Sequence, residues 1–376
     1  MPLFDVVVCG LGAMGSATLY HLAARGKRVL GIEHYAPGHE RGSSHGASRI
    51  IRLAYFEHPS YVPLLRHAYR LWRELEQTSG QNLLHITGIL EIGSQKSAVV
   101  RGTLASARLH GLEHEVLAPS ELMRRFPAFE IPADYLGVFQ PEGGWLAVES
   151  PIQAWISQAM RAGAQVRTGD TVYAIEQLPG AVRIRSNAGT IEAGAAVICV
   201  GPWTRALLPR LAAPLRVTRQ VMAWFEAEPS WPALPVFLLE SGHGVHYGIP
   251  PERTNSAGIK VAKHHHRDET IDPDNYDRTI SHADQTVIRA ALADHLPAAN
   301  GRLLAAKTCL YTMTPDGDFV IDRLPGSPHI VVASPCSGHG FKFAPVVGEI
   351  LAELVTHGQT RHDITRFRLG RFDEPT

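Results

Sequence analysis

The chain has 376 residues, and its 36 Lys and Arg residues balance its 36 Asp and Glu residues. This balance gives no reason to expect a nucleic-acid partner or an acidic membrane surface. Hydrophobic residues make up 45% of the sequence and charged residues 19%, which is typical of a soluble protein whose core is large enough for two domains. No apolar run approaches the roughly 18 residues of a membrane-spanning helix, so we expect no membrane contact.

The cysteines give no metal-binding pattern. Cys9, Cys199, Cys309 and Cys336 are scattered along the chain, and the first two stand in apolar runs where a small buried side chain is expected. The first predicted strand starts at Phe4, which leaves no room for a signal peptide. We therefore expect no metal site and a reducing, cytoplasmic location.

Residues 4–33 carry the clearest pattern in the chain. An apolar run ends at Gly10, Gly12 and Gly15, a helical pattern follows, and a second apolar run ends on Glu33. This order predicts a strand, a glycine-rich turn, a helix and a parallel strand, as in a dinucleotide-binding βαβ unit. The glycines would let the backbone approach a pyrophosphate at the helix N-terminus, and Glu33 would accept hydrogen bonds from a ribose. The motif does not by itself separate FAD from NAD.

The remaining elements follow in chain order. A polar, glycine-rich loop is expected over residues 39–48. Helices are predicted at 60–75, 97–109, 119–126, 150–162, from 281 onward and at 346–354, and strands at 86–92, 164–167, 181–186, 195–200 and 330–333. Apolar and polar residues alternate between 215 and 260, which favours an antiparallel sheet.

These elements predict an α/β fold with two interleaved domains. A Rossmann-like nucleotide-binding domain is expected from residues 1–84, 145–214 and 310–376. An α+β substrate domain dominated by an antiparallel sheet is expected from residues 85–144 and 215–309.

Four further motifs carry a family resemblance. They are SSHGASRIIR from residue 43, HYGIP and GIKVAKH between residues 246 and 264, KTCLYTMTPDGDFVID from residue 307, and CSGHGFKF from residue 336. Together with the N-terminal glycine motif, they resemble the monomeric sarcosine oxidase family, which includes the N-methyltryptophan oxidases. The resemblance runs from the first strand to TRFRL at residues 365–369.

The resemblance implies FAD as the cofactor, joined through the sulfur of Cys309 to its 8α-methyl group. A thiolate can attack that carbon once it has become electrophilic. The loop around His339 is also expected to approach the flavin ring. The cofactor-binding residues expected from the glycine motif and the resemblance are Gly10, Gly12, Gly15, Glu33, Ser43, Ser44, Gly201, Trp203, Gly338, Gly340 and Lys342.

The resemblance also implies a substrate site. Arg52 and Lys342 would hold the substrate carboxylate, since both cations stand in apolar company and need a counter-charge. Tyr247, His264 and Tyr311 would line the substrate cavity, although plain core packing remains an alternative for the two tyrosines.

Three residues match family positions beside the flavin. Lys260 is implied to assist oxygen activation, because a cation stabilises negative charge on dioxygen. His45 and Arg49 would supply a positive field that favours anionic reduced flavin. A lysine that faces solvent from a strand is the alternative for Lys260.

The implied reaction is the oxidation of a small N-methyl amino acid such as sarcosine, with dioxygen as acceptor, to the amino acid, formaldehyde and hydrogen peroxide. A larger or cyclic substrate, such as N-methyltryptophan, pipecolate or proline, is an open alternative. So are a flavin dehydrogenase that uses another electron acceptor and a non-enzymatic subunit that only retains FAD. The resemblance suggests a monomer.

Overall fold

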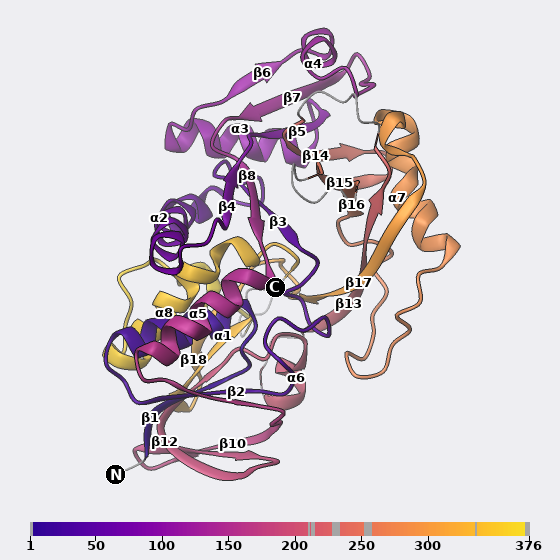
Figure 1. Cartoon of the computed structure of the whole chain (residues 1–376). Coiled ribbons are helices and arrows are strands. Elements are labelled where there is room, and N and C mark those ends of the chain that lie inside the picture. The colour runs from indigo at the N-terminus through magenta and orange to yellow at the C-terminus, as the bar shows by residue number, and fades with distance from the viewer. Residues whose placement is uncertain are drawn as a thin grey trace.

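The N-terminal βαβ unit forms as the glycine pattern predicts. Strand β1 (Phe4–Cys9) leads into helix α1 (Ala13–Ala24), which returns to strand β2 (Val29–Glu33) parallel to β1. The computed structural model describes residues 3–209, 211, 215–227, 234–251, 258–334 and 337–372 (Figure 1).

An eight-stranded sheet is built around this unit. Its order is β10-β11-β12-β1-β2-β9, and β19 pairs with β12 and carries β18 at its far edge. Strands β9, β2, β1, β12 and β19 are parallel neighbours, whereas β10, β11 and β18 join antiparallel. The added strands are β9 (Gln165–Thr168), β10 (Val172–Leu178), β11 (Ala181–Ser186), β12 (Gly189–Ile198), β18 (Val320–Leu324) and β19 (Ser327–Ser334).

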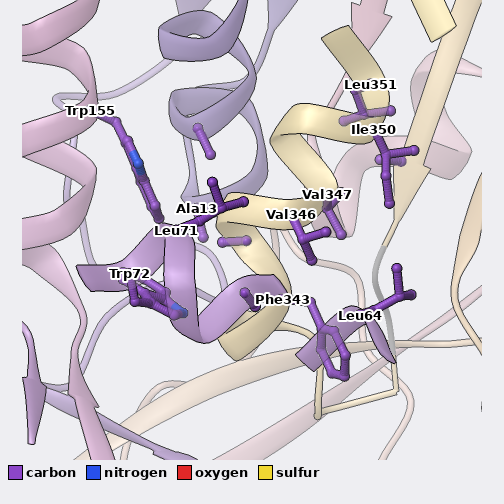
Figure 2. Packing of buried hydrophobic residues seen from close by; sticks show 14 of the residues in the cluster. Ala13, Leu64, Leu71, Trp72, Trp155, Phe343, Val346, Val347, Ile350 and Leu351 are labelled. Carbon is purple, nitrogen blue, oxygen red and sulfur yellow. The ribbon is translucent and has the colours of Figure 1, made fainter. Parts of the chain in front are cut away.

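Four helices form a hydrophobic core beside this sheet. Helices α1, α2 (Val62–Ser79), α5 (Glu149–Arg161) and α8 (Ala344–His357) pack together beside the sheet (Figure 1), and Figure 2 shows their buried side chains facing one another. The Trp72 and Trp155 rings lie 5.1 Å apart between centroids. The Trp72 indole nitrogen donates a 2.9 Å hydrogen bond to the carbonyl of Lys342, so the core also fixes a predicted site residue.

A second eight-stranded sheet is separate from the first. Its order is β17-β13-β16-β15-β14-β5-β7-β6, and every pair is antiparallel except β14 with β5, which confirms the predicted antiparallel character. Its strands are β5 (Ile89–Ser94), β6 (Glu115–Leu117), β7 (Tyr135–Gln140), β13 (Arg216–Phe225), β14 (Val236–Ser241), β15 (Gly244–Ile249), β16 (Ile259–Lys263) and β17 (Leu303–Met313).

The other predicted helices also form. They are α3 (Ala98–His110), α4 (Pro119–Arg125) and α7 (His282–His295), and a short α6 (Thr204–Leu207) was not predicted. Helix α7 begins with the capping box expected from Ser281 and Asp284. Among the described residues, no helix combines the length and apolar character needed to cross a bilayer.

One predicted strand differs in the structure, because part of it belongs to a small third sheet. The strand expected at 86–92 is two strands, because the chain leaves β4 (Leu84–Ile86) and enters β5 in the second sheet. Gly88 makes the break at φ +76°, a conformation that favours glycine. Strand β4 joins β8 (Gly144–Ala147) and β3 (Ser48–Ile51) in the order β3-β8-β4.

The expected domain boundaries do not coincide with the ends of the strands. The boundaries at 84/85, 144/145 and 309/310 each fall inside a strand, namely β4, β8 and β17. Residue 214, at another boundary, and Cys336, at the start of the last motif, lie outside the described residues. The division into two domains stays a prediction, and the crossing strands connect the two large sheets.

Candidate active site

A cavity of about 550 Å³ opens where the parallel strands of the first sheet end. In α/β sheets, this edge is where dinucleotides bind. The cavity is lined by most of the residues predicted to bind the cofactor, namely Gly10, Gly12, Glu33, Ser43, Ser44, Gly201, Trp203, Gly338 and Gly340. Gly15 and Lys342 are not among its lining residues.

The glycine turn leaves the backbone open toward this cavity. Gly10 has φ +85°, and a Cβ atom on Gly15 would stand 1.8 Å from the Gly10 carbonyl oxygen. Helix α1 begins at Ala13, with Gly12 as its N-cap and no cap from that residue's side chain. Its first N–H group donates to Ser44 Oγ at 3.3 Å, and the next N–H groups of the first turn are available to an anion. The Glu33 carboxylate lies at the far strand end and accepts hydrogen bonds from the backbone N–H groups of Leu11 and Tyr35. This donor set fits the diphosphate and ribose of a dinucleotide.

We expect Gly15→Ala to lose most of its bound flavin, because the added methyl group would push the turn away from its present position. The ratio of flavin to protein absorbance in the purified variant measures this effect. Gly242→Ala is the matched control, since a Cβ there meets no atom within 4 Å. Normal flavin content in Gly15→Ala would show that the close approach of helix and turn is not needed for binding.

His45 differs from the expectation in its charge. Its side chain is buried, and burial, aided by the nearby Arg49, lowers its pKa to about 3, so the imidazole is neutral at pH 7. Neither ring nitrogen has a hydrogen-bond partner among the described residues. His45 is not among the residues that line either cavity, whereas Arg49 lines both, so Arg49 is the candidate source of the expected positive field.

A second cavity of about 80 Å³ adjoins the first, because Arg49, Tyr311, Gly338 and Phe341 line both. The smaller cavity contains every residue predicted to bind substrate, together with Cys309. These residues are Arg52, Tyr247, His264, Cys309, Tyr311 and Lys342. Segments far apart in the sequence therefore meet at one point, as the resemblance implies.

Two buried cations stand at this cavity. Arg52 donates from Nη2 to both carboxylate oxygens of Glu57 at 2.9 and 2.8 Å, and its guanidinium carbon lies 4.2 Å from the centroid of the Tyr55 ring. The Lys342 ammonium lies 5.2 Å from the same centroid and donates to the carbonyl of His339 at 2.8 Å. Burial, with Arg52 nearby, lowers the pKa of Lys342 to about 7.

Cys309 lines the smaller cavity and contacts a cation. Strand β17 places it opposite Gln220 of β13, and Arg49 Nη2 approaches its Sγ to 3.5 Å. The thiol is therefore buried at the smaller cavity and held by a contact with a cationic donor.

The predicted aromatic lining is neutral. The Tyr311 hydroxyl and His264 Nδ1 lie 3.4 Å apart. Burial lowers the pKa of His264 to about 3 and raises that of Tyr247 to about 12. The positive charge of the smaller cavity therefore comes from Arg49, Arg52 and Lys342.

Lys260 is buried rather than directed to solvent. Its ammonium donates to the carbonyl oxygens of Gly46 and Ser48, both at 2.7 Å, and lies 5.4 Å from the centroid of the Trp224 ring. It is not among the residues that line either cavity. The solvent-facing alternative is wrong, while the oxygen-activating role stays a prediction.

Comparisons with known proteins agree with this site. Residues 5–354 match the FAD dependent oxidoreductase family. The chain belongs to this family. A monomeric sarcosine oxidase from Streptomyces avermitilis is 41% identical to it, over 97% of each chain. An N-methyl-L-tryptophan oxidase from Salmonella agona is 34% identical, over 99% of this chain and 100% of its own. The resemblance read from the motifs is confirmed.

Solved structures give the same picture of this oxidoreductase. The open form of NikD, an unusual amino acid oxidase essential for nikkomycin biosynthesis, superimposes with a TM-score of 0.87 at 28% identity and 98% coverage of both chains. The L-proline dehydrogenase from P. horikoshii has a TM-score of 0.79 at 21% identity, over 99% of both chains, and supports the fold alone.

Several residues of the oxidoreductase's smaller cavity were not predicted. Glu57 and Gln220 line it, and Glu91 lies behind Arg52. Glu91 did leave a signal, because it is an acid inside the apolar run of a predicted strand. His339, expected near the flavin, lines the smaller cavity and lies 2.6 Å from the Tyr55 hydroxyl.

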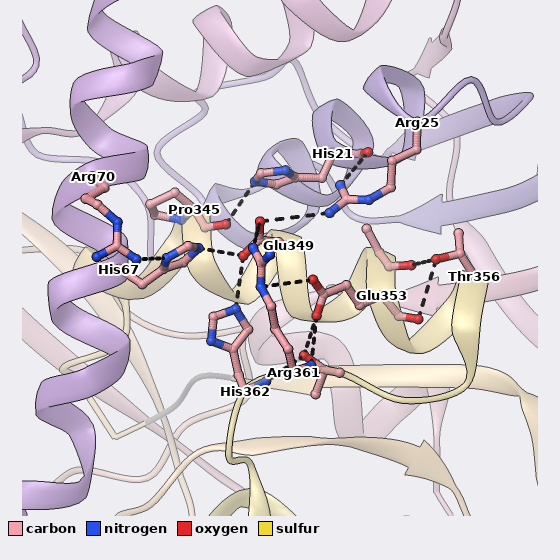
Figure 3. Close-up of polar contacts among 12 residues, drawn as sticks. His21, Arg25, His67, Arg70, Pro345, Glu349, Glu353, Thr356, Arg361 and His362 are labelled. Atoms are coloured by element: carbon pink, nitrogen blue, oxygen red, sulfur yellow. Dashed lines mark hydrogen bonds and ion pairs between the residues drawn. The ribbon is translucent and has the colours of Figure 1, made fainter.

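One group elsewhere has the residue types of a metal site. His67, Glu349 and His362 gather among α2, α8 and the segment after α8 (Figure 3). Arg70 donates to His67 Nδ1 at 2.5 Å, so the proton of a neutral His67 ring sits on Nε2, which is 2.6 Å from Glu349. Arg361 occupies the other oxygen of Glu349 at 2.6 Å. These contacts describe an ion-pair cluster, and the expectation of no metal site stays a prediction.

Proposed function

We propose that this oxidoreductase oxidises a small N-methyl amino acid, and that sarcosine is the substrate that fits best. The observation that carries the proposal is the pair of buried cations, Arg52 and Lys342, at a small cavity that also contains Cys309. In the net reaction, sarcosine, dioxygen and water give glycine, formaldehyde and hydrogen peroxide. The N-methyl carbon is oxidised and dioxygen is reduced.

The cations provide the means to orient such a substrate. Arg52 Nη1 is buried and has no hydrogen-bond partner among the described residues, so it can donate to an incoming carboxylate. Lys342 adds a second positive charge next to the same ring, that of Tyr55. A carboxylate held at two points fixes the direction of the adjoining C–N bond. FAD, when bound, supplies the redox chemistry by accepting electrons from the substrate and passing them to dioxygen.

The size of the smaller cavity supports sarcosine over larger substrates. Since one water-sized group needs about 10–15 Å³ of such space, the roughly 80 Å³ present accommodates about five to eight of them. That matches sarcosine and is too small for an indole ring. Phe56, Leu238 and Val245 close the apolar side. A panel of sarcosine, N-methyltryptophan, pipecolate and proline, assayed for peroxide, tests this choice, and a preference for N-methyltryptophan would overturn it.

The proposal also covers the electron acceptor, the cofactor linkage, the cellular location and the oligomeric state. Dioxygen is the acceptor, FAD is bound through Cys309, and the protein is a cytoplasmic monomer. The buried Lys260 cation supports dioxygen as the acceptor, and the Arg49–Cys309 contact supports attachment of FAD at Cys309. Cys9, Cys199 and Cys309 are all unpaired thiols, which supports a reducing compartment. Substrate-dependent flavin reduction without peroxide under air would instead identify a dehydrogenase.

We expect Arg52→Lys to raise KM for sarcosine by about 10- to 100-fold while kcat changes less. Lysine keeps the positive charge but loses the planar pair of donors, and a hydrogen bond to a charged group contributes about 1.5–3 kcal/mol. Steady-state peroxide assays measure both constants. Arg66→Lys, on the exposed side of α2, is the control. An unchanged KM in Arg52→Lys would remove Arg52 from the substrate site.

A further inference from the structure

Glu91 is a buried carboxylate behind the substrate-binding arginine. It lies on β5 with no exposed surface, and its Oε1 is 3.6 Å from Arg52 Nε. Gln140 donates to its Oε2 at 2.5 Å, while Oε1 has no hydrogen-bond partner among the described residues. Glu57 accepts from Nη2 of the same guanidinium, so Arg52 contacts two carboxylates.

The single charge of Arg52 is already paired with two carboxylates when no substrate is bound. Arg49 and Lys342 add positive charge elsewhere in the same cavity. A substrate carboxylate on Arg52 would be a third negative group around one buried guanidinium, and like charges that close together in a buried site are strongly unfavourable. This repulsion is relieved if one of the two resident carboxylates leaves or becomes neutral.

Glu91 is the carboxylate suited to become neutral. Burial opposes the charge of Glu57, but Arg52 outweighs it and lowers the pKa of Glu57 to about 2, so that group stays ionised. Burial raises the pKa of Glu91 to about 7, although Arg52, Thr103 and Gln140 favour its charged form. The full burial of Glu91 also prevents it from turning to solvent.

We propose that Glu91 is a positioning residue that acts through Arg52 and takes up a proton from solution when a carboxylate-bearing substrate binds to that arginine. This inference rests on the proposed substrate site. The Oε1 atom changes from carboxylate to carboxylic acid, and no other bond is made or broken. Arg52 then keeps its contacts with Glu57 and Glu91 while its charge becomes available to the substrate.

A dependence of binding on pH follows. Below pH about 7 Glu91 already carries the proton, so a carboxylate binds without further proton uptake. As the pH rises above this value, binding must also protonate Glu91, and the dissociation constant increases up to about tenfold per pH unit. Deprotonation of Lys342 also weakens carboxylate binding as the pH rises, because its ammonium loses its positive charge. A variant at position 91 separates the two contributions.

Acetate is a suitable probe, because it carries the carboxylate and no amine of its own. Calorimetric titration of the FAD-loaded enzyme at pH 8, in two buffers of different ionisation enthalpy, gives the protons taken up per acetate. We expect uptake approaching one proton in the unchanged enzyme and less than about half of that in Glu91→Gln. The variant should also bind acetate several-fold more tightly at pH 8. Glu353→Gln, a buried carboxylate paired with Arg361 outside both cavities, should behave like the unchanged enzyme.

Equal proton uptake in the unchanged enzyme and Glu91→Gln would overturn the inference and assign the proton to Lys342. Infrared difference spectra of the unchanged enzyme test it without any substitution. Acetate should produce a carboxylic-acid C=O band that shifts in D₂O, and its absence would also overturn the inference. Acetate binding that ignores Arg52→Lys would instead overturn the proposed substrate site, so the two failures are distinguishable.

Discussion

Cys309→Ala is expected to give a colourless polypeptide after acid precipitation and washing, whereas the unchanged protein gives a yellow one. The reason is geometric: Sγ is buried at the smaller cavity, and Arg49 Nη2 contacts it at 3.5 Å. Alanine removes the only atom at this position that could form a thioether. The visible absorbance of the washed, denatured pellet measures covalent flavin directly, independently of turnover.

Cys9→Ala is the matched control for this experiment. Cys9 is fully buried in β1 and lines neither cavity, so its pellet should remain yellow. A yellow Cys309→Ala pellet would exclude Cys309 as the attachment point. A colourless pellet from the unchanged protein would leave the cofactor site intact but make its binding non-covalent.

The sequence predicted the elements whose signals are local. The N-terminal βαβ unit, the amphipathic helix α2 and the capping box of α7 each depend on residues close together in the chain. The predicted strand at 86–92 was wrong because an apolar run records burial but not which sheet provides it. The chain leaves the third sheet and enters the second at Gly88. The position of Gly88 depends on contacts with Phe139 and Gly143, which lie far along the sequence.

The residues of the candidate site likewise fall into those that sequence motifs predicted and those that they did not. Residues inside recognisable motifs, such as Arg52, Cys309 and Lys342, line the cavity where the resemblance implies. The pairing of Arg52 with Glu91 could not be predicted, because it arises only when the segment after β3 and strand β5 come together in space. Glu57, five residues after Arg52, pairs with it through the fold of the loop between them, which no motif records. The neutral state of His45 is likewise a product of burial, which a sequence motif does not record.

The second large effect is expected at Lys260. Lys260→Met should slow the oxygen half-reaction by about 10²–10³-fold and the substrate half-reaction far less, because removing one preorganised electrostatic group costs that much. The ammonium is held by the carbonyls of Gly46 and Ser48, so its charge is fixed beside the loop that leads to Arg49. A cation fixed in this way stabilises negative charge on dioxygen without reorganising. Anaerobic reduction by sarcosine and reoxidation by dioxygen, each followed by stopped-flow absorbance, measure the two half-reactions separately.

The same hydrogen bonds offer a competing explanation, which the experiment separates. If Lys260 only braces the loop at residues 46–48, Met at this position would displace Arg49 and slow both half-reactions together. Lys263→Met is the control, since Lys263 ends the same strand and lines neither cavity. Selective slowing of the oxygen step in Lys260→Met alone would support a role for the charge itself. Equal slowing of both steps would reduce Lys260 to a structural brace and leave dioxygen without an assigned partner in this site.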